Sequence, residues 1–135
     1  MVPDGLVSLR SRDGFAATVE RLAAAITAHG LTLFADIDHA LAAATIGLRL
    51  RPTRVLIFGN PNLGTALMRA CQVMGIDLPV KTLVWEDEAG TAWVTYKDPI
   101  ALVRHYGMEP RSEPVVGALS SALRSLARAA ADPNA

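Results

Sequence analysis

The sequence has few of the residues that mark several specialised classes of protein. Its 135 residues include one cysteine, which excludes an internal disulfide, and aromatic residues make up only 5%. Basic and acidic residues balance at 13 each, which argues against nucleic-acid binding, because phosphate contacts rely on surplus Lys and Arg. No apolar run approaches the roughly 20 residues that span a bilayer, and residues 1–5 do not resemble a secretory signal. We therefore expect a soluble cytoplasmic protein without a membrane partner.

The stretch 51–68 indicates a buried strand that leads directly into a helix. Residues 55–58 form an apolar run, and Gly59-Asn60-Pro61 breaks it before a helical pattern begins. Pro61 suits the first helical position, where its missing N–H costs nothing. We therefore take this strand as central to the fold and place Val55 and Ile57 in the core.

Hydrophobic periodicity and turn residues predict ten elements along the chain. The strands are expected at 6–10, 31–37, 54–58, 81–85 and 91–96, and the helices at 13–29, 39–46, 60–74, 100–106 and 115–131. One hairpin and segregated helices favour an α+β fold. We predict a two-layer sandwich, with about five mainly antiparallel strands, helices on one face and an extra C-terminal helix. The predicted core is Phe15, Leu22, Ile26, Val55, Ile57, Leu67 and Met74.

Several separated motifs agree in order and spacing with one known family. They are Asp36-Ile37-Asp38-His39, Arg51-Pro52-Thr53, Phe58-Gly59-Asn60-Pro61, Gly64-Thr65, Asp77-Leu78-Pro79 with Lys81, and Tyr96-Lys97-Asp98-Pro99. With these motifs the chain resembles the domain of unknown function 302 family over about residues 6–108. The resemblance implies a small bacterial or archaeal α+β domain that tends to form dimers and has no established activity. We therefore divide the chain into residues 1–108 and an appended linker and amphipathic helix, 109–135.

The turn from Gly59 to Thr65 is the first candidate binding site. Its spacing is similar to that of a phosphate-binding loop, but Thr65 stands where the lysine belongs and Pro61 removes a backbone donor, which argues against nucleotide hydrolysis. The helix N-terminus that follows can still attract an anion. Alternatively, Asn60 only caps the helix and Gly59 only provides a tight turn.

Asp36, Asp38 and His39 form the second candidate site. A carboxylate can orient a histidine and raise its basicity, which suits general-base chemistry or ligand binding. Alternatively, Asp38 caps the following helix. No second histidine has metal-ligand spacing, so we predict no metal and no cofactor. Arg51 belongs to an arginine cluster that could receive an anion or could form a solvated turn.

These candidates favour a non-catalytic domain that binds a small ligand, for which an anion is the candidate, between His39 and the Asn60 turn. That hypothesis requires the short helix, or a second subunit, to bring His39 and Asn60 to one concave site. The alternatives are a small enzyme that uses Asp38 and His39 as an acid–base pair, and a structural or protein-interaction module. We also predict a homodimer, in which the apolar stripe of the last helix packs between chains or against the sheet: Val116, Leu119, Leu123 and Leu126.

Overall fold

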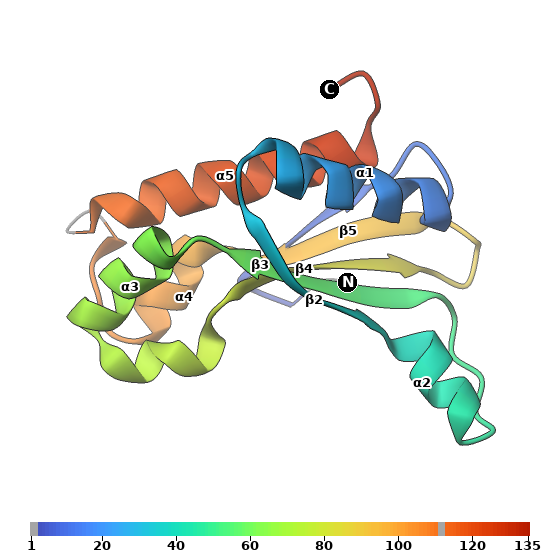
Figure 1. Ribbon diagram of the computed structural model, residues 1–135, viewed down its shortest axis with the longest axis horizontal. Helices are drawn as coiled ribbons and strands as arrows, with labels where there is room; N and C mark the ends of the chain where they lie inside the picture. Colours follow the sequence, from blue (N-terminus) through green and yellow to red (C-terminus); the bar gives the residue numbers. More distant parts are fainter. Residues whose placement is uncertain (1–2, 111–112) are drawn as a thin grey trace.

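The computed structural model describes residues 3–110 and 113–135 and has two layers, a sheet and a set of helices (Figure 1). The elements are β1 (Leu6–Arg10), α1 (Phe15–Ala28), β2 (Thr32–Asp38), α2 (His39–Thr45), β3 (Thr53–Gly59), α3 (Pro61–Ala70), the 3-10 helix η1 (Gln72–Asp77), β4 (Val80–Glu86), β5 (Ala92–Lys97), α4 (Pro99–His105) and α5 (Pro114–Ala131). The predicted α+β class and the predicted order of elements are confirmed.

The five strands form one antiparallel sheet in the order β1-β5-β4-β3-β2. β2 is therefore an edge strand, and it is irregular between Leu33 and Ala35, where its register against β3 shifts. A shift of this kind bends a strand and is common at sheet edges. Thr32 lies opposite Gly59, and Asp38 lies opposite Arg54, so this strand pair runs the full length of the sheet.

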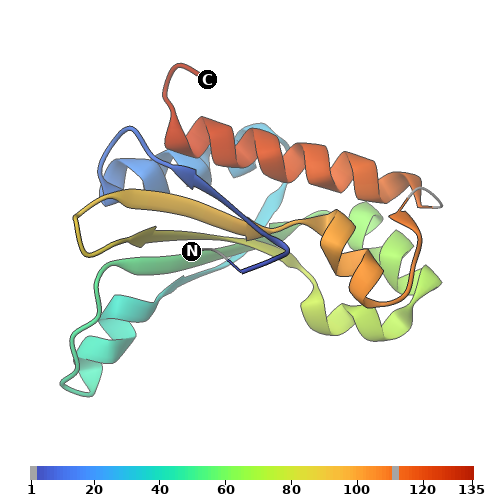
Figure 2. The ribbon, with the colours of Figure 1, turned by 180° about the vertical axis from the view of Figure 1, so that it is seen from behind.

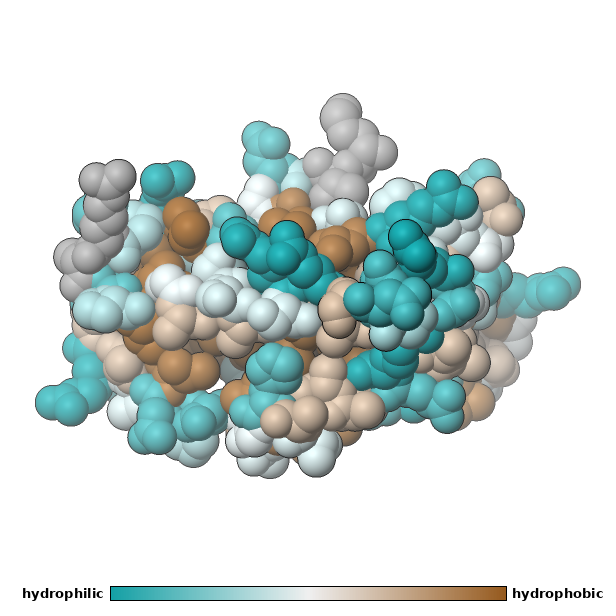
Figure 3. All heavy atoms as spheres, turned by 90° about the horizontal axis from the view of Figure 1, so that it is seen from above, coloured by the Kyte–Doolittle hydropathy of each residue, from teal (hydrophilic) through white to brown (hydrophobic). Residues whose placement is uncertain are grey.

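Helices α1 and α5 cover one face of the sheet and share its core (Figures 1 and 2). Leu22 and Ile26 of α1 are fully buried, and Leu123 and Leu126 of α5 are buried in the same cluster. Seen from above, polar side chains cover much of this helix layer, and hydrophobic side chains are visible between them (Figure 3). The stripe of the last helix thus packs against its own sheet. The division of the chain at residue 108 stays a prediction, although α5 packs with the rest as one core.

The side chains of β3 that pack into this core are not the ones predicted. Leu56 and Phe58 are buried under the helices, at 0% and 1% exposure, whereas Val55 and Ile57 are half-buried on the opposite face. Every residue from Val55 to Phe58 is apolar, so the sequence does not indicate which alternate set faces inward. Leu22, Ile26, Leu67 and Met74 are buried as predicted, and Phe15 packs at the margin of the core.

Two predicted helix boundaries also differ. The second long helix was expected to reach Met74, but α3 ends at Ala70 because Cys71 adopts an extended conformation, and η1 follows. The first long helix was expected to begin at residue 13, but α1 begins at Phe15 with Gly14 as its N-cap. The Asp13 carboxylate instead accepts a hydrogen bond from Arg21 at 2.8 Å.

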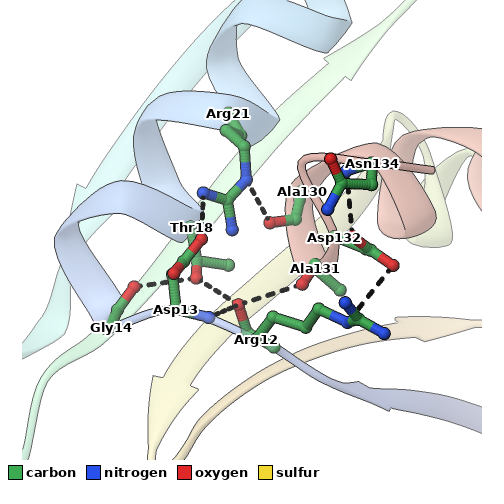
Figure 4. Close-up of polar contacts among 10 residues, drawn as sticks. Arg12, Asp13, Gly14, Thr18, Arg21, Ala130, Ala131, Asp132 and Asn134 are labelled. Carbon is green, nitrogen blue, oxygen red and sulfur yellow. Dashed lines mark hydrogen bonds and ion pairs between the residues drawn. The ribbon is translucent and has the colours of Figure 1, made fainter.

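Two arginines hold the C-terminal end of α5 against the first part of the chain (Figure 4). Arg21 Nε donates to the carbonyl oxygen of Ala130 at 2.9 Å, and the Arg12 amide donates to the carbonyl of Ala131 at 2.8 Å. The Arg12 side chain also pairs with Asp132 at 3.4 Å. The last carbonyls of a helix lack intrahelical partners and carry partial negative charge, so donors and cations at this end stabilise the helix.

The opposite face of the sheet has no helix across it among the described residues (Figures 1 and 2). We call it the open face. By the strand register it carries five half-buried apolar side chains near its centre and one end: Val55, Ile57, Leu83, Trp85 and Trp93. Helix α2 and the loop after it, residues 39–50, project beyond the sheet on this side, and we call them the arm. The two tryptophan rings stack, with centroids 6.1 Å apart.

Candidate functional site

The predicted site residues fall into two groups at opposite ends of the β2–β3 pair. Asp38 and His39 stand where β2 passes into α2, opposite Arg54, whereas Asn60 follows Gly59, which lies opposite Thr32. Strands rise about 3.3 Å per residue, so six residues of β3 separate the two groups by roughly 20 Å. A single site that contains both His39 and Asn60 therefore does not exist within one chain.

The acidic residues at the arm end have other partners than His39. Asp36 accepts two hydrogen bonds from Arg54, at 2.8 and 2.7 Å, and these bonds raise the pKa of Arg54. Asp38 caps α2 by accepting from the Leu41 amide at 2.9 Å. His39 is exposed, and no hydrogen bond among the described residues joins it to either carboxylate. The geometry thus does not assemble an acid–base pair here.

Arg51 lies apart from both groups, beside the β4–β5 hairpin. Its Nε atom donates to the Glu86 carbonyl at 3.3 Å, and its Nη1 atom is 4.0 Å from the Glu88 carboxylate. Both side chains of that ion pair are more than half exposed. Within residues 3–110 and 113–135, no three His, Cys, Asp or Glu side chains are arranged to hold a metal ion.

The N-terminus of α3 has no backbone donor left for an anion in its first four positions. Pro61 lacks an N–H, and the Asn62 amide donates to the Asn60 side chain at 2.9 Å. The amides of Leu63 and Gly64 both donate to the Asn60 carbonyl, at 3.0 and 3.3 Å. Asn60 therefore caps the helix in the way the structural alternative predicted.

The same turn forms one wall of an apolar cavity of about 300 Å³. The cavity lies where the ends of β3 and β4 meet α3 and α5, and its lining is almost entirely carbon. Asn60 and Thr65 are the polar side chains in the lining. The other walls come from distant parts of the chain, among them Phe34 and Phe58, Leu63 and Met68, Pro79, and Ala122 and Leu126.

A second, more polar pocket, which was not predicted from the sequence, lies between the start of β1 and α4. Asp77 lines it together with Lys97, Asp98 and His105. Asp77 accepts hydrogen bonds from the Tyr106 hydroxyl and, at 3.2 Å, from Lys97 Nζ. The Tyr106 bond, with the lysines, lowers the pKa of Asp77, and the same bond raises the pKa of Tyr106.

The signal for this pocket was present in the sequence. Asp77 and Lys97 belong to two of the motifs that carry the family resemblance, Asp77-Leu78-Pro79 and Tyr96-Lys97-Asp98-Pro99. Because Asp77 and Lys97 are 20 positions apart in the sequence, their contact could not be predicted from the motifs alone. Asp77 thus has both Lys97 and Tyr106 as partners, and these bonds tether η1 to β5 and to the C-terminal end of α4.

The fold and these sites define an antiparallel α+β domain with a preformed apolar cavity, and the predicted positions assemble no catalytic group. The sequence model of the family described as "Domain of unknown function DUF302" matches residues 7–126. The chain belongs to this family, which confirms the resemblance stated above. The match extends into α5 as far as Leu126.

A solved structure shows the same fold. It is titled as an uncharacterized conserved protein DUF302 from Bacillus stearothermophilus, and it matches with a TM-score of 0.83 and 19% identity. The match covers 95% of this chain and 99% of that chain. At this identity the likeness supports the fold alone.

Curated relatives share more sequence over only part of their length. Proteins named "Fluoride-specific ion channel FluC 1" from Brucella suis biovar 1 (strain 1330) and from Brucella abortus biovar 1 (strain 9-941) are 37% identical over 131 residues. The match covers 97% of this chain but 52% and 48% of these proteins, so the chain spans about half their length. In the part of this chain that the structure describes, no helix has the length and hydropathy needed to cross a membrane.

Proposed function

We propose that this domain binds a small, uncharged, apolar ligand in the cavity beside the Gly59-Asn60-Pro61 turn. The observation that carries the proposal is the preformed apolar cavity of about 300 Å³. Ligand pockets are typically concave, mainly apolar and about 300–1,000 Å³, with a small number of polar groups that orient the ligand. Asn60 and Thr65 supply such groups here.

The chemistry of the turn favours a neutral ligand over an anion. The first amides of α3 donate to Asn60, and Pro61 has none, so the turn offers no cradle of free N–H groups. Among residues 3–110 and 113–135, no lysine, arginine or histidine belongs to the lining. A carboxylate or phosphate in this cavity would lose its hydration without gaining a charged partner.

A neutral and a negatively charged version of the same fluorescent probe test this proposal. N-phenyl-1-naphthylamine and its sulfonate, 1-anilinonaphthalene-8-sulfonate, share the same rings. We expect saturable fluorescence enhancement, with the neutral probe bound about tenfold more tightly, which corresponds to about 1.4 kcal/mol. Tighter binding of the sulfonate would support the anionic ligand instead.

A cavity-filling variant shows whether the probe binds at this place. Ala122 lines the cavity from α5, so Ala122→Phe should weaken binding of the neutral probe at least about tenfold. Ala118→Phe is the matched control, because Ala118 is exposed one turn earlier on the same helix and outside the lining. Equal binding by both variants, with circular dichroism unchanged, would contradict the proposal.

We also propose that the chain forms a homodimer, as the sequence analysis expects. The apolar stripe of α5 is buried within its own chain, so this helix does not supply the contact surface. Support comes instead from the large exposed hydrophobic side chains near the open face. A concentration series by light scattering tests the proposal, and a constant monomer mass would contradict it.

The remaining alternatives have less support. An enzyme that uses Asp38 and His39 would need a hydrogen bond between them, and Asp38 is engaged with the Leu41 amide. The channel name of the curated relatives is not carried over, because about half of each relative lies outside the match.

A further inference from the structure

Large exposed hydrophobic side chains are concentrated in one segment of the chain. Of the nine found among the described residues, seven lie between residues 33 and 50: Leu33, Phe34, Ile37, Leu41, Ile46, Leu48 and Leu50. Their exposed fractions run from 40% to 72%. The five at the arm end, from Ile37 to Leu50, expose on the order of 500 Å² at roughly 100 Å² each, which reaches the 300–600 Å² that is typical of the largest apolar patch on a monomer.

This segment borders a second apolar surface, the open face. Ile37 lies opposite Val55, which lies opposite Leu83, so an apolar row crosses three strands. The row continues with Thr95 and Ser8, which hydrogen-bond to each other, and charged side chains lie outside it. An apolar centre with a polar rim is the usual anatomy of a protein interface.

The two tryptophans of the open face have their polar atoms engaged. Trp85 Nε1 donates to Thr95 Oγ1 and Trp93 Nε1 to Asp87, each at 2.9 Å. Covering these rings would therefore leave no indole N–H unpaired. Tryptophan with a paired N–H is well suited to the dry centre of an interface.

The arm lies beside this face and projects away from α1 and α5 (Figures 1 and 2). Each chain therefore presents a projecting apolar element next to a flat apolar surface. We propose that the partner is a second copy of this chain, and that the arm of each copy packs on the open face of the other about a two-fold axis. This inference deepens the proposed self-association and rests on it.

Self-complementarity and area favour a second copy as the occupant. In a two-fold arrangement one kind of contact forms twice, so each copy would bury both its arm and its open face. A stable interface needs about 800 Å² per partner, which the exposed hydrophobic side chains and the open face together can supply. The formal net charge of zero adds no long-range repulsion between copies.

Charges placed on the arm test the surface. Ile46 and Leu48 are 72% and 61% exposed, so Ile46→Glu with Leu48→Glu should leave the fold intact and weaken dimerisation on the order of 100-fold. The matched control is Val73→Glu with Ile76→Glu, because these side chains are 69% and 84% exposed outside the segment. Sedimentation equilibrium measures both. Equal dimerisation by the two double variants would overturn the inference.

Cross-linking tests the arrangement in a Cys71→Ser background. Two proteins are prepared, one with Leu48→Cys on the arm and one with Leu83→Cys on the open face. A short bismaleimide cross-linker is added to each protein alone and to a mixture of the two. We expect cross-linked dimers mainly in the mixture. Dimers cross-linked through Leu48→Cys alone would place arm against arm and overturn the inference, while the proposed dimer would stand.

Tryptophan emission and vesicle flotation complete the test. The chain has two tryptophans, both on the open face, so association should shift their emission to shorter wavelength and dilution should reverse the shift. A wild-type monomer at every concentration would overturn both the inference and the proposed dimer. A monomer that floats with phosphatidylcholine–phosphatidylglycerol vesicles, and fails to float with the arm variant, would assign the surface to a membrane instead.

Discussion

The two faces of the sheet are built from the same strands but have different surroundings. On the covered face, Leu56, Phe58, Val84 and Val94 are buried to 1% exposure or less beneath α1 and α5. On the open face their immediate neighbours in sequence, such as Val55 and Leu83, are equally apolar and only half-buried. One layer of helices can bury one face of a sheet. Apolar residues on both faces of a strand favour cover on both sides, and the described helices of this chain cover only one side (Figures 1 and 2).

The largest expected effect comes from removing a large side chain on each face of β3. Phe58→Ala should lower the free energy of unfolding by about 3–5 kcal/mol, because it empties a site that is 1% exposed. Ile57→Ala, on the open face, should cost only about 1–2 kcal/mol in the monomer, since Ile57 is half-buried. Urea unfolding at low protein concentration measures both variants. Equal losses would show that the open face is covered within a single chain.

The position of each element could be predicted because its ends carry local signals. Asp38, Asn60 and Asp98 accept hydrogen bonds from the first turn of α2, α3 and α4, respectively. Gly30 and Gly47 have positive φ angles of 71° and 76° just after α1 and α2, where a left-handed residue ends a helix. Such signals depend on neighbours within a few residues, so the chain reveals them without a structure.

The inward face of β3 and the cavity could not be predicted, because both depend on distant contacts. Residues 55–58 are all apolar, so the alternation that would reveal an inward face is missing. Gly59 and Asn60 were correctly singled out as a turn, but the cavity they line is closed by Phe34 and by α5. An isolated turn looks like an anion site, and only the complete lining shows that it is apolar.

Two threonines, one on each face, should respond in opposite directions to the same change. Thr82 is fully buried on the covered face, and its hydroxyl has no hydrogen-bond partner among the described residues. Thr82→Val should therefore stabilise the protein by about 1 kcal/mol. Thr95→Val should cost about 1–2 kcal/mol, because Trp85 Nε1 and Ser8 Oγ lose their partner. Chemical denaturation of both variants measures this, and destabilisation by Thr82→Val would mean that its hydroxyl is hydrogen-bonded.

The Asp77–Tyr106 bond closes one end of the covered core, where α4 contributes Val103. Its contribution should depend on pH. Because the Tyr106 bond and the lysines lower the folded-state pKa of Asp77, the stabilisation is present above the ordinary pKa of 3.8 and is lost as pH falls through the lower folded-state pKa. Tyr106→Phe should lower the free energy of unfolding at neutral pH and lower it much less in strong acid.

Unfolding free energies measured from neutral pH into strong acid check the Tyr106 prediction. Glu88→Gln is the control, since the Glu88 side chain is 90% exposed, and its curve should follow that of the wild type. A cost of Tyr106→Phe that stays constant with pH would assign the effect to lost packing. The substitution would then not report on the hydrogen bond to the Asp77 carboxylate.

The smallest expected effect concerns the ion pair at the margin of the covered face, between Arg54 and Asp36. The pair is bidentate, at 2.8 and 2.7 Å, and its side chains are 34% and 28% exposed. Exposed pairs contribute about 0.2–1 kcal/mol, and good bidentate geometry favours the upper part of that range, so Arg54→Ala should cost about 0.5–1 kcal/mol.

Arg51→Ala is the matched comparison for Arg54→Ala. The Arg51 pair spans 4.0 Å to Glu88, with side chains 55% and 90% exposed, so its loss should leave the free energy of unfolding almost unchanged.

A double-mutant cycle between Arg54→Ala and Asp36→Ala isolates the interaction energy of the pair. This energy should shrink as salt is added, because exposed charges are screened. A coupling that stays constant in high salt would show that this pair is shielded from solvent. It would then place the margin of the strands, like their open face, under cover from a second chain.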